Sequence, residues 1–550
     1  MSNNPSSTKK RAADAKSPTI DSPAKHLRTE DSQPGCLETS VKESVEDMFH
    51  PDGSKVFNDP VHGHMEFHPL CIAIIDTPQF QRLRYLKQLG ATYSVYPGAA
   101  HNRFEHSLGV GHLAGELVFD LRTRQPELGI TWKDILCVQI AGLCHDLGHG
   151  PFSHLFEHRF VPATRPLLKP KWTHERASVN MFDYMVKQKA NGLEQKFDYW
   201  GFSGREIEFM KELILGKHPR EGDCYYGNEK AFLYEIVANK RNGVDVDKWD
   251  YFRRDCLQLG IFSSFDHTRF MKFARVIDVD GEQQICVREK EALDVYQMFH
   301  TRHSLHLKAY QHKSAYVIGV MLTDAIIEAN NHIRIPGDNG KWCKMSECVD
   351  PENIDAYMNL TDNVVSHILL TDNPKLEVAK KLLRDVERRK LYKCVGESMP
   401  SKDSDTFDEK MVEDGINAEV QRSVTASGGK SLTEQYPDSR FVVQVVKLDF
   451  GKGDQNPVDH LRFFSKHDKT KAVHVRPAEV SSFLPQVVFK EQLVRVFFRL
   501  TDNPKRDLDS LKMLQEGFQN WCKSKIGEKG FKFFNIPKIL ANQAGELKAY

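Results

Sequence analysis

The fold is decided by one stretch of sequence, His145-Asp146-Leu147-Gly148-His149-Gly150-Pro151-Phe152-Ser153-His154-Leu155-Phe156-Glu157-His158. It holds four histidines and two acids, and it directly follows an apolar run at 135–144 that predicts a buried helix. Burying ionisable groups costs several kcal/mol unless they are paired or bind a metal. The stretch therefore predicts a polar site at the end of a core helix.

An adjacent His-Asp pair offers one imidazole nitrogen and one carboxylate oxygen to a single cation. His106 lies on the inward face of a helix predicted by the apolar spacing at 106–121. Asp247, Tyr251 and Asp255 fall at i, i+4 and i+8, so we expect them to face one cavity. Isolated His-Asp pairs occur by chance, but the ordered set predicts a metal site with open positions for water and substrate. The predicted ligands are His106, His145, Asp146 and Asp247.

Length and composition limit the class of protein. A chain of 550 residues predicts two or three structural units. Lys and Arg number 76 against 75 Asp and Glu, so there is no global basic field that alone would imply nucleic-acid binding, and any site for a polyanion must be local. Eleven cysteines without a paired CxxC motif indicate free thiols. We find no signal peptide or bilayer-spanning run, and expect a soluble intracellular protein without a membrane partner.

The pattern along the chain predicts a mainly α fold with small β-hairpin insertions and a smaller α+β lobe at the C-terminal end. Lys9-Lys10-Arg11 resembles an import signal, so we expect the nucleus, with the cytoplasm left open. In the second half, a strand is predicted at 441–450 and apolar-faced helices at 483–500 and 508–521. The predicted divisions are a disordered tail at 1–50, a helical catalytic domain at 51–393, a polar linker at 394–440, and the C-terminal lobe at 441–550, expected to carry oligomer contacts and regulatory sites.

Five motifs together resemble the HD-domain phosphohydrolases, and within them the SAM-and-HD-domain deoxynucleoside triphosphate (dNTP) triphosphohydrolases of vertebrates. The resemblance runs from about Lys55 into the C-terminal lobe. One departure is that 1–50 is too short and too polar to form a sterile alpha motif domain. The motifs lie at 57–63, 101–107, 145–158, 245–251 and 309–313.

The resemblance implies an HD-domain core that cleaves dNTPs to deoxynucleosides and inorganic triphosphate. It implies zinc at the metal site, with iron and manganese left open, and Mg²⁺ with the nucleotides. His154, oriented by Glu157 where the relatives have Asp, would protonate the leaving 5′ oxygen. The implied catalytic residues are His149, His154, Glu157 and His174. The implied substrate contacts are Arg103, Lys248, Tyr251 and Arg302 on the triphosphate, and Gln88, Leu89, Asp255, Tyr310 and Gln311 around the deoxyribose.

The resemblance also implies a homotetramer activated by nucleotides between subunits. For GTP or dGTP the matching positions are Lys55, Val56, Asp76, Gln81, Arg84, Arg389 and Lys393. For a second, dNTP site they are Asn58, Val95, Arg269, Arg288, Lys290, His312, Lys313 and Lys466. Asp294 stands where the relatives have Asn, which adds a negative charge beside an anionic ligand. The biological role implied is lowering dNTP pools, and with it antiviral defence within innate immunity.

Two other functions fit the metal set. One is a different HD activity, a nucleotide phosphodiesterase or a nuclease, since the ligands alone do not choose the substrate. The other is a regulator that binds RNA or single-stranded DNA through local cationic clusters. Near-zero net charge and the lack of an aromatic-studded basic stripe disfavour this second reading. The identity of the product distinguishes the enzymatic alternatives.

Overall fold

The computed structural model describes residues 51–217, 224–226, 229–400, 406–427, 440–480, 489–501, 503–526 and 531–533. The predicted tail at 1–50 and its import signal lie outside these residues. No helix among the described ranges has both the length and the apolar character needed to cross a membrane.

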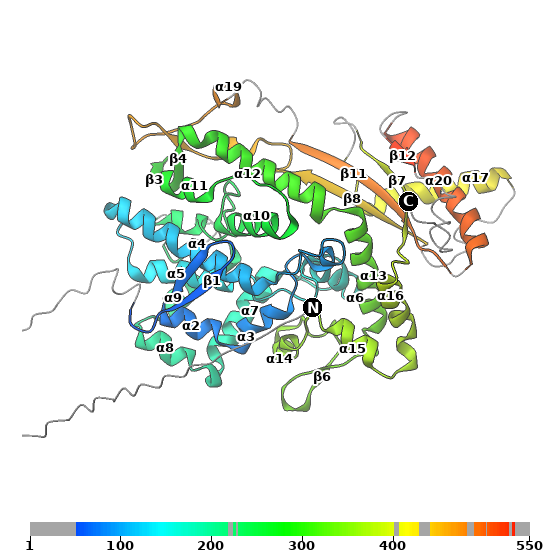
Figure 1. Cartoon of the computed structure of the whole chain (residues 1–550), viewed down its shortest axis with the longest axis horizontal. Coiled ribbons are helices and arrows are strands. Elements are labelled where there is room, and N and C mark those ends of the chain that lie inside the picture. The colour runs from blue at the N-terminus through cyan, green and yellow to red at the C-terminus, as the bar shows by residue number, and fades with distance from the viewer. Residues whose placement is uncertain are drawn as a thin grey trace, which may run out of the picture. The chain divides into compact units, whose positions relative to one another are not determined.

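The described residues between 51 and 400 are mainly helical, as predicted (Figure 1). Helix α4, Arg103–Arg124, packs against α5, Trp132–Cys144, and against α10, Val246–Leu259. On α4 the side chains of Val110, Leu113, Leu117 and Leu121 are buried, as their spacing predicts. These three helices matter most because the predicted metal ligands lie at their ends. Further helices are α2 Pro69–Ile75, α3 Pro78–Gln81, α6 Val161–Thr164, α7 His174–Lys187, α8 Leu193–Tyr199, α9 Gly204–Leu215, α11 His267–Phe273, α12 Ala292–Leu305, α13 Lys313–Ala329, α14 Ile354–Met358, α15 Val364–Leu370 and α16 Glu377–Glu387.

Small β elements are inserted into this helical core. Antiparallel strands β1, Lys55–Asp59, and β2, Gly63–Phe67, form a hairpin. The predicted hairpin around Asp280-Gly281 is confirmed: β3, Ala274–Val279, pairs with β4, Glu282–Arg288, and both turn residues have positive φ. Strands β9, Phe463–Phe464, and β10, Ala472–Val473, extend the β3–β4 sheet, and β5, Ile335–Pro336, pairs with β6, Trp342–Cys343.

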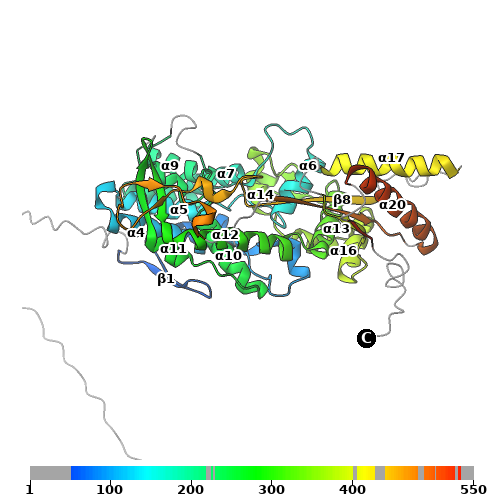
Figure 2. The same cartoon turned by 90° about the horizontal axis from the view of Figure 1, so that it is seen from above.

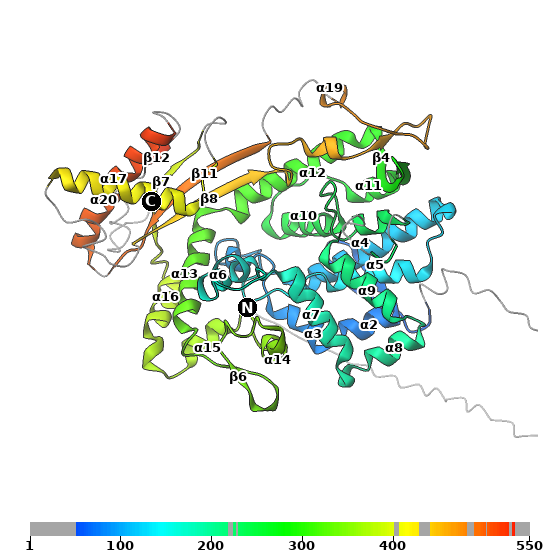
Figure 3. The same cartoon turned by 180° about the vertical axis from the view of Figure 1, so that it is seen from behind.

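The C-terminal part of the chain is an antiparallel sheet with the strand order β12-β7-β11-β8. Helices α17, Glu409–Ser427, and α20, Pro504–Lys525, pack against each other beside this sheet, as Figures 1 to 3 show. Their facing side chains form a second hydrophobic core. The strands are β7 Lys393–Ser398, β8 Phe441–Asp449, β11 Lys490–Phe498 and β12 Phe531–Phe533.

The structure corrects two predictions in this region. The stretch 483–500 was predicted as a helix, but its described part forms strand β11, which is buried between β7 and β8. The predicted linker at 394–440 contains nearly all of strand β7 and the whole of helix α17. Its composition is polar overall, yet Val412, Ile416 and Val420 form a buried stripe at helical spacing. The strand at 441–450 and the helix at 508–521 are confirmed, whereas the domain boundaries stay predictions.

Candidate metal centre

Three helix ends bring the four predicted ligands together. His106 lies in the first turn of α4, whose N-terminus is fixed by a capping box between Asn102 and Glu105. His145 ends α5, and Asp146 follows it. Asp247 lies in the first turn of α10, which begins at the N-cap Asp245. Residues far apart in sequence therefore meet where these helices converge.

The ligand atoms are spaced as a divalent ion requires. Nε2 of His106 lies 3.1 Å from Oδ1 of Asp247 and 3.5 Å from Oδ2 of Asp146. Nε2 of His145 lies 3.4 Å from Oδ1 of Asp146 and 3.5 Å from Oδ1 of Asp247. Ligands held ~2.0–2.1 Å from a tetrahedral ion stand ~3.3 Å from one another. The four side chains therefore fit a divalent metal.

The neighbours of the two histidines support the same interpretation. Nδ1 of His145 lies 2.7 Å from the carbonyl oxygen of Gly142, which directs the other nitrogen, Nε2, towards the ligand cluster. That Nε2 is buried and has no hydrogen-bond partner among the described residues. Burial alone would lower the pKa of His106, but hydrogen bonds to Asp247 and Asp250 outweigh it and raise the pKa to about 10. The carboxylates hold positive charge at His106, as they would hold a metal.

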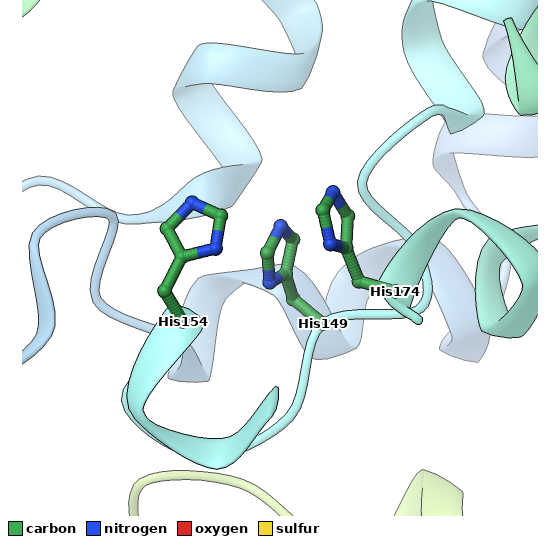
Figure 4. Close-up of side chains that lie close together, drawn as sticks. All are labelled: His149, His154 and His174. Carbon is green, nitrogen blue, oxygen red and sulfur yellow. The ribbon is translucent and has the colours of Figure 1, made fainter. Parts of the chain in front are cut away.

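The loop after the metal ligands carries the predicted catalytic histidines. Gly148 approaches helix α7 so closely that an added Cβ would lie 2.2 Å from the backbone nitrogen of Ser178. This contact brings the rings of His149 and His174 into a stack 4.0 Å apart, and the ring of His154 lies 5.1 Å from that of His149. Figure 4 shows the three imidazoles side by side. All three are on one wall of the same cavity.

Charge differs sharply among these histidines and their neighbours. Burial, together with the positive charge of Arg103, holds the pKa of His149 well below its usual range. His149 is therefore a neutral imidazole. Burial would raise the pKa of Asp146, but the adjacent Arg103 guanidinium outweighs it and keeps the carboxylate ionised.

Glu157 lies beside two of the predicted catalytic histidines. Its Oε2 lies 2.7 Å from Nδ1 of His174 and 3.7 Å from Nδ1 of His154. The direct hydrogen bond is thus to His174, while His154 is exposed to the cavity. Glu157 lies in a π-helical turn, Phe156–Phe160, which follows His154 and Leu155.

The cavity has a volume of about 930 Å³, which is in the range of small-molecule sites. All nine predicted substrate contacts line it together with the four predicted metal ligands. Lys248 is 2.8 Å from Asp245, and Arg302 contacts the backbone oxygen of Asp449 at the end of β8. The lining residues among the predictions are Gln88, Leu89, Arg103, His106, His145, Asp146, His149, His154, His174, Asp247, Lys248, Tyr251, Asp255, Arg302, Tyr310 and Gln311.

The residues predicted to bind activating nucleotides do not line this cavity. Near the β1–β2 hairpin, Lys55 pairs with Asp76 at 3.3 Å and Gln81 accepts a hydrogen bond from Arg84 at 2.7 Å. A second cluster surrounds the Phe273 ring. Its cations are Arg269, Arg288 and Lys290. The nucleotide-binding roles of all these positions stay predictions, as do those of the other positions expected to bind activators: Val56, Asn58 and Val95, and His312, Lys313, Arg389, Lys393 and Lys466.

Several contacts in the site had no separate prediction. Asp250 contacts Nδ1 of His106, the ring nitrogen on the side opposite the ligand cluster, and Nε2 of His101 contacts Asp255. Buried Arg82 donates to the carbonyl oxygen of His149 and so supports the histidine loop. His101 and Asp250 belong to motifs that stand out in the sequence, but only the fold shows which member of each motif faces the cavity.

This arrangement of helices around a His-Asp centre defines the HD-domain class, and the HD domain family model matches residues 103–252. Among curated relatives, the deoxynucleoside triphosphate triphosphohydrolase SAMHD1 of Bos taurus is 50% identical over 484 residues, covering 86% of this chain and 78% of the relative. SAMHD1 of Homo sapiens is 48% identical, with 86% and 74% covered, and the SAMHD1 homolog of Dictyostelium discoideum is 38% identical, with 81% and 77% covered. The chain belongs to the SAMHD1 family of HD-domain enzymes.

Proposed function

We propose that this chain hydrolyses dNTPs to deoxynucleosides and inorganic triphosphate. The observation that carries the proposal is one cavity in which a two-histidine, two-aspartate centre shares its walls with the cations Arg103, Lys248 and Arg302 and with the predicted sugar contacts. The names of the similar SAMHD1 relatives support the same reaction. A bound metal would polarise the α-phosphoryl group and lower the pKa of a water bound to it.

The chain's own residues would orient the nucleotide around that centre. Arg103 is buried against Asp146 and donates to Ser153 Oγ at 2.9 Å, so its guanidinium is held rigidly beside the ligands. Together with Lys248 and Arg302 it would neutralise the triphosphate. His154 is exposed to the cavity and would protonate the 5′ oxygen, while His149, held neutral, would accept or donate a hydrogen bond at the α-phosphate.

The far side of the cavity would bind the deoxyribose. Tyr310 donates to Oδ2 of Asp255 at 2.6 Å, and Nε2 of His101 lies 2.7 Å from the other carboxylate oxygen. Because both oxygens of Asp255 are engaged, this wall is rigid. A rigid wall against the sugar 2′ position would reject ribonucleotides, since an added hydroxyl needs both room and a partner.

Product analysis tests the reaction. Purified full-length protein would be incubated with dGTP, and with dATP in the presence and absence of GTP, in Mg²⁺ buffer. Deoxynucleoside and intact inorganic triphosphate are the expected products. Release of nucleoside monophosphates would indicate a phosphodiesterase or nuclease instead, and the absence of any turnover would direct attention to binding of single-stranded nucleic acid.

We further propose how the chain is regulated, which metal it binds and what its reaction does in the cell. The chain would bind GTP or dGTP, and then a dNTP with Mg²⁺, between subunits of a homotetramer. The cation cluster around Phe273 supports this, because Arg269 and Lys290 share the single carboxylate of Glu291 and an anionic ligand would offset the remaining positive charge. Zinc is the proposed metal, since it suits a donor set of two histidines and two carboxylates, as iron and manganese also do.

The enzyme would lower nuclear dNTP pools and so restrict viral replication. Sedimentation with and without GTP and dNTP tests the assembly.

A further inference from the structure

We infer that Asp250, Arg254 and Asp59 form a buried relay that positions the metal ligand His106 and joins it to the β1–β2 hairpin. None of the three is a predicted ligand or substrate contact. They are positioning residues, which act on the reaction through His106. The inference rests on the metal site of the proposed function.

The first step of the relay is the contact between Asp250 and His106. Nδ1 of His106 lies 2.7 Å from Oδ2 of Asp250, and both side chains are fully buried. An imidazole whose Nδ1 donates to a carboxylate keeps Nε2 free for a metal. Nε2 of His106 is the nitrogen that faces Asp247 and Asp146. When a metal takes the place of the proton on Nε2, Asp250 holds the remaining proton on Nδ1 and fixes the orientation of the ring.

The second step holds Asp250 itself in place. Arg254, one helical turn along α10, donates to both carboxylate oxygens of Asp250, from Nε at 3.0 Å and from Nη2 at 2.9 Å. His62 contributes a further contact, with Nε2 2.7 Å from Oδ1. The facing helix α4 leaves room for this cluster at Gly109, where an added Cβ would lie 1.9 Å from Oδ1 of Asp250. With four contacts the carboxylate has one available orientation.

The third step reaches the hairpin. Nη1 of Arg254 donates to Oδ2 of Asp59 at 2.8 Å. The other oxygen of Asp59 accepts from the backbone nitrogens of Val61 at 2.8 Å and His62 at 2.9 Å, which close the turn between β1 and β2. Asp59 ends β1, the strand that carries the predicted activator residues Lys55, Val56 and Asn58. A ligand that shifts this strand would therefore act on His106 through buried, charged hydrogen bonds.

The test measures metal affinity, so it does not depend on turnover. Full-length protein is stripped of metal and titrated with Zn²⁺ in competition with a chromogenic chelator. The variants are Asp250→Asn, Arg254→Lys and Asp59→Asn. The matched control is Asp350→Asn, which breaks a two-pronged arginine–carboxylate pair with Arg165 and leaves the relay untouched. Thermal unfolding of each metal-free variant reports stability separately.

We expect Asp250→Asn to weaken Zn²⁺ binding about 10- to 100-fold, as loss of a histidine-orienting carboxylate does at other metal sites. Arg254→Lys should weaken Zn²⁺ binding less than Asp250→Asn does, because Arg254 acts on His106 through Asp250. Asp59→Asn should weaken it least, because Asp59 acts through both Arg254 and Asp250. Asp350→Asn should leave it unchanged. The visible spectrum of the Co²⁺-loaded protein should shift in the relay variants and not in the control.

The outcomes separate this inference from the proposed function. If the unaltered protein binds no Zn²⁺, the metal site and the proposed function fail together. If the unaltered protein binds Zn²⁺ and the Asp250→Asn and Asp59→Asn proteins bind it as tightly as the unaltered protein does, the relay is wrong and the metal site stands. The relay is also wrong if each loss of affinity follows the loss of thermal stability, with the control included. Should Asp250→Asn fail to fold, the more distant Asp59→Asn decides the question.

Discussion

Nε2 of His106 lies 3.1 Å from Oδ1 of Asp247, although the two residues lie in the first turns of different helices, α4 and α10. Burial would raise the pKa of Asp247, but the nearby imidazoles of His106 and His145 outweigh it and lower the pKa below its usual range. The ring nitrogen of His106 and the ionised carboxylate oxygen of Asp247 therefore face each other as two donor atoms suited to a cation between them. The site thus has the charge that a metal needs before any metal binds.

Loss of one ligand should therefore remove both metal and activity. We predict that His145→Ala and Asp146→Asn each lower the rate of triphosphate release at least about a thousandfold, because a Lewis-acid metal contributes several kcal/mol to catalysis. Metal content by mass spectrometry and triphosphate release would be measured on the same samples. His158→Ala is the control, since His158 belongs to the same stretch but not to the ligand set. Full turnover by either ligand variant after metal removal would contradict the assignment.

A second prediction concerns Glu157, which contacts His174 more closely than His154. Glu157→Gln removes the charge that orients both histidines, so we expect kcat to fall about 100-fold with little change in KM. Glu157→Asp should retain more activity, since the carboxylate remains. Glu175→Gln is the matched control, because its carboxylate lies 3.7 Å from the same nitrogen of His174. Equal losses in the Glu157→Gln and Glu175→Gln proteins would show that Glu157 has no special role.

Much of the helical core could be predicted because its signals are local. Helix α5 is apolar from Ile135 to Cys144 except for Gln139, and α4 places Val110, Leu113 and Leu117 on one face. Strand β11 could not be separated from a helix, because a short apolar run fits either structure until its pairing partners are known. Helix α17 was hidden for the opposite reason. Its buried stripe is narrow, and the partner that covers it, α20, lies much later in the chain.

The residues of the site also fall into those that the sequence predicts and those that only the fold reveals. That the four candidate metal ligands lie together could be predicted because each stands in a distinctive motif, in the order His, His-Asp, Asp. Asp250 could not be ranked above its neighbours, since it lies three residues after Asp247 in a segment with four acids. Only the helix geometry turns Asp247 towards the cavity and Asp250 towards the far nitrogen of His106. Sequence therefore indicates the donors, and the fold assigns their roles.

A third prediction concerns the choice between deoxyribose and ribose. The Tyr310 ring, fixed by its hydrogen bond to Asp255, is part of the wall proposed to exclude the 2′ hydroxyl. Tyr310→Ala should lower the ratio of kcat/KM for dATP to that for ATP roughly 10- to 100-fold, because the wall is removed. Tyr310→Phe keeps the ring and should preserve most of the discrimination. The ratio would be measured by competition at saturating GTP. An unchanged ratio in the alanine variant would place the sugar elsewhere.

The last prediction concerns Asp294, which stands where the similar enzymes are expected to have an uncharged Asn. Burial raises the pKa of Asp294 to about 6. Its carboxyl group is therefore mostly ionised at pH 7.5 and mostly neutral at pH 5.5. An ionised Asp294 would repel a triphosphate bound near Arg269 and Lys290, by about 1 kcal/mol for charges a few ångströms apart in water.

Asp294→Asn should therefore bind the activating dNTP roughly fivefold more tightly than the unaltered protein at pH 7.5. At pH 5.5 the two proteins should bind it equally, because the natural carboxyl is then neutral as well. Affinity would be measured by calorimetry with a non-hydrolysable dNTP in the presence of GTP. Asp198→Asn, which removes an exposed acid outside both predicted nucleotide sites, controls for net charge. An affinity gain that is the same at both pH values, or shared by the control, would show that Asp294 does not face the bound nucleotide.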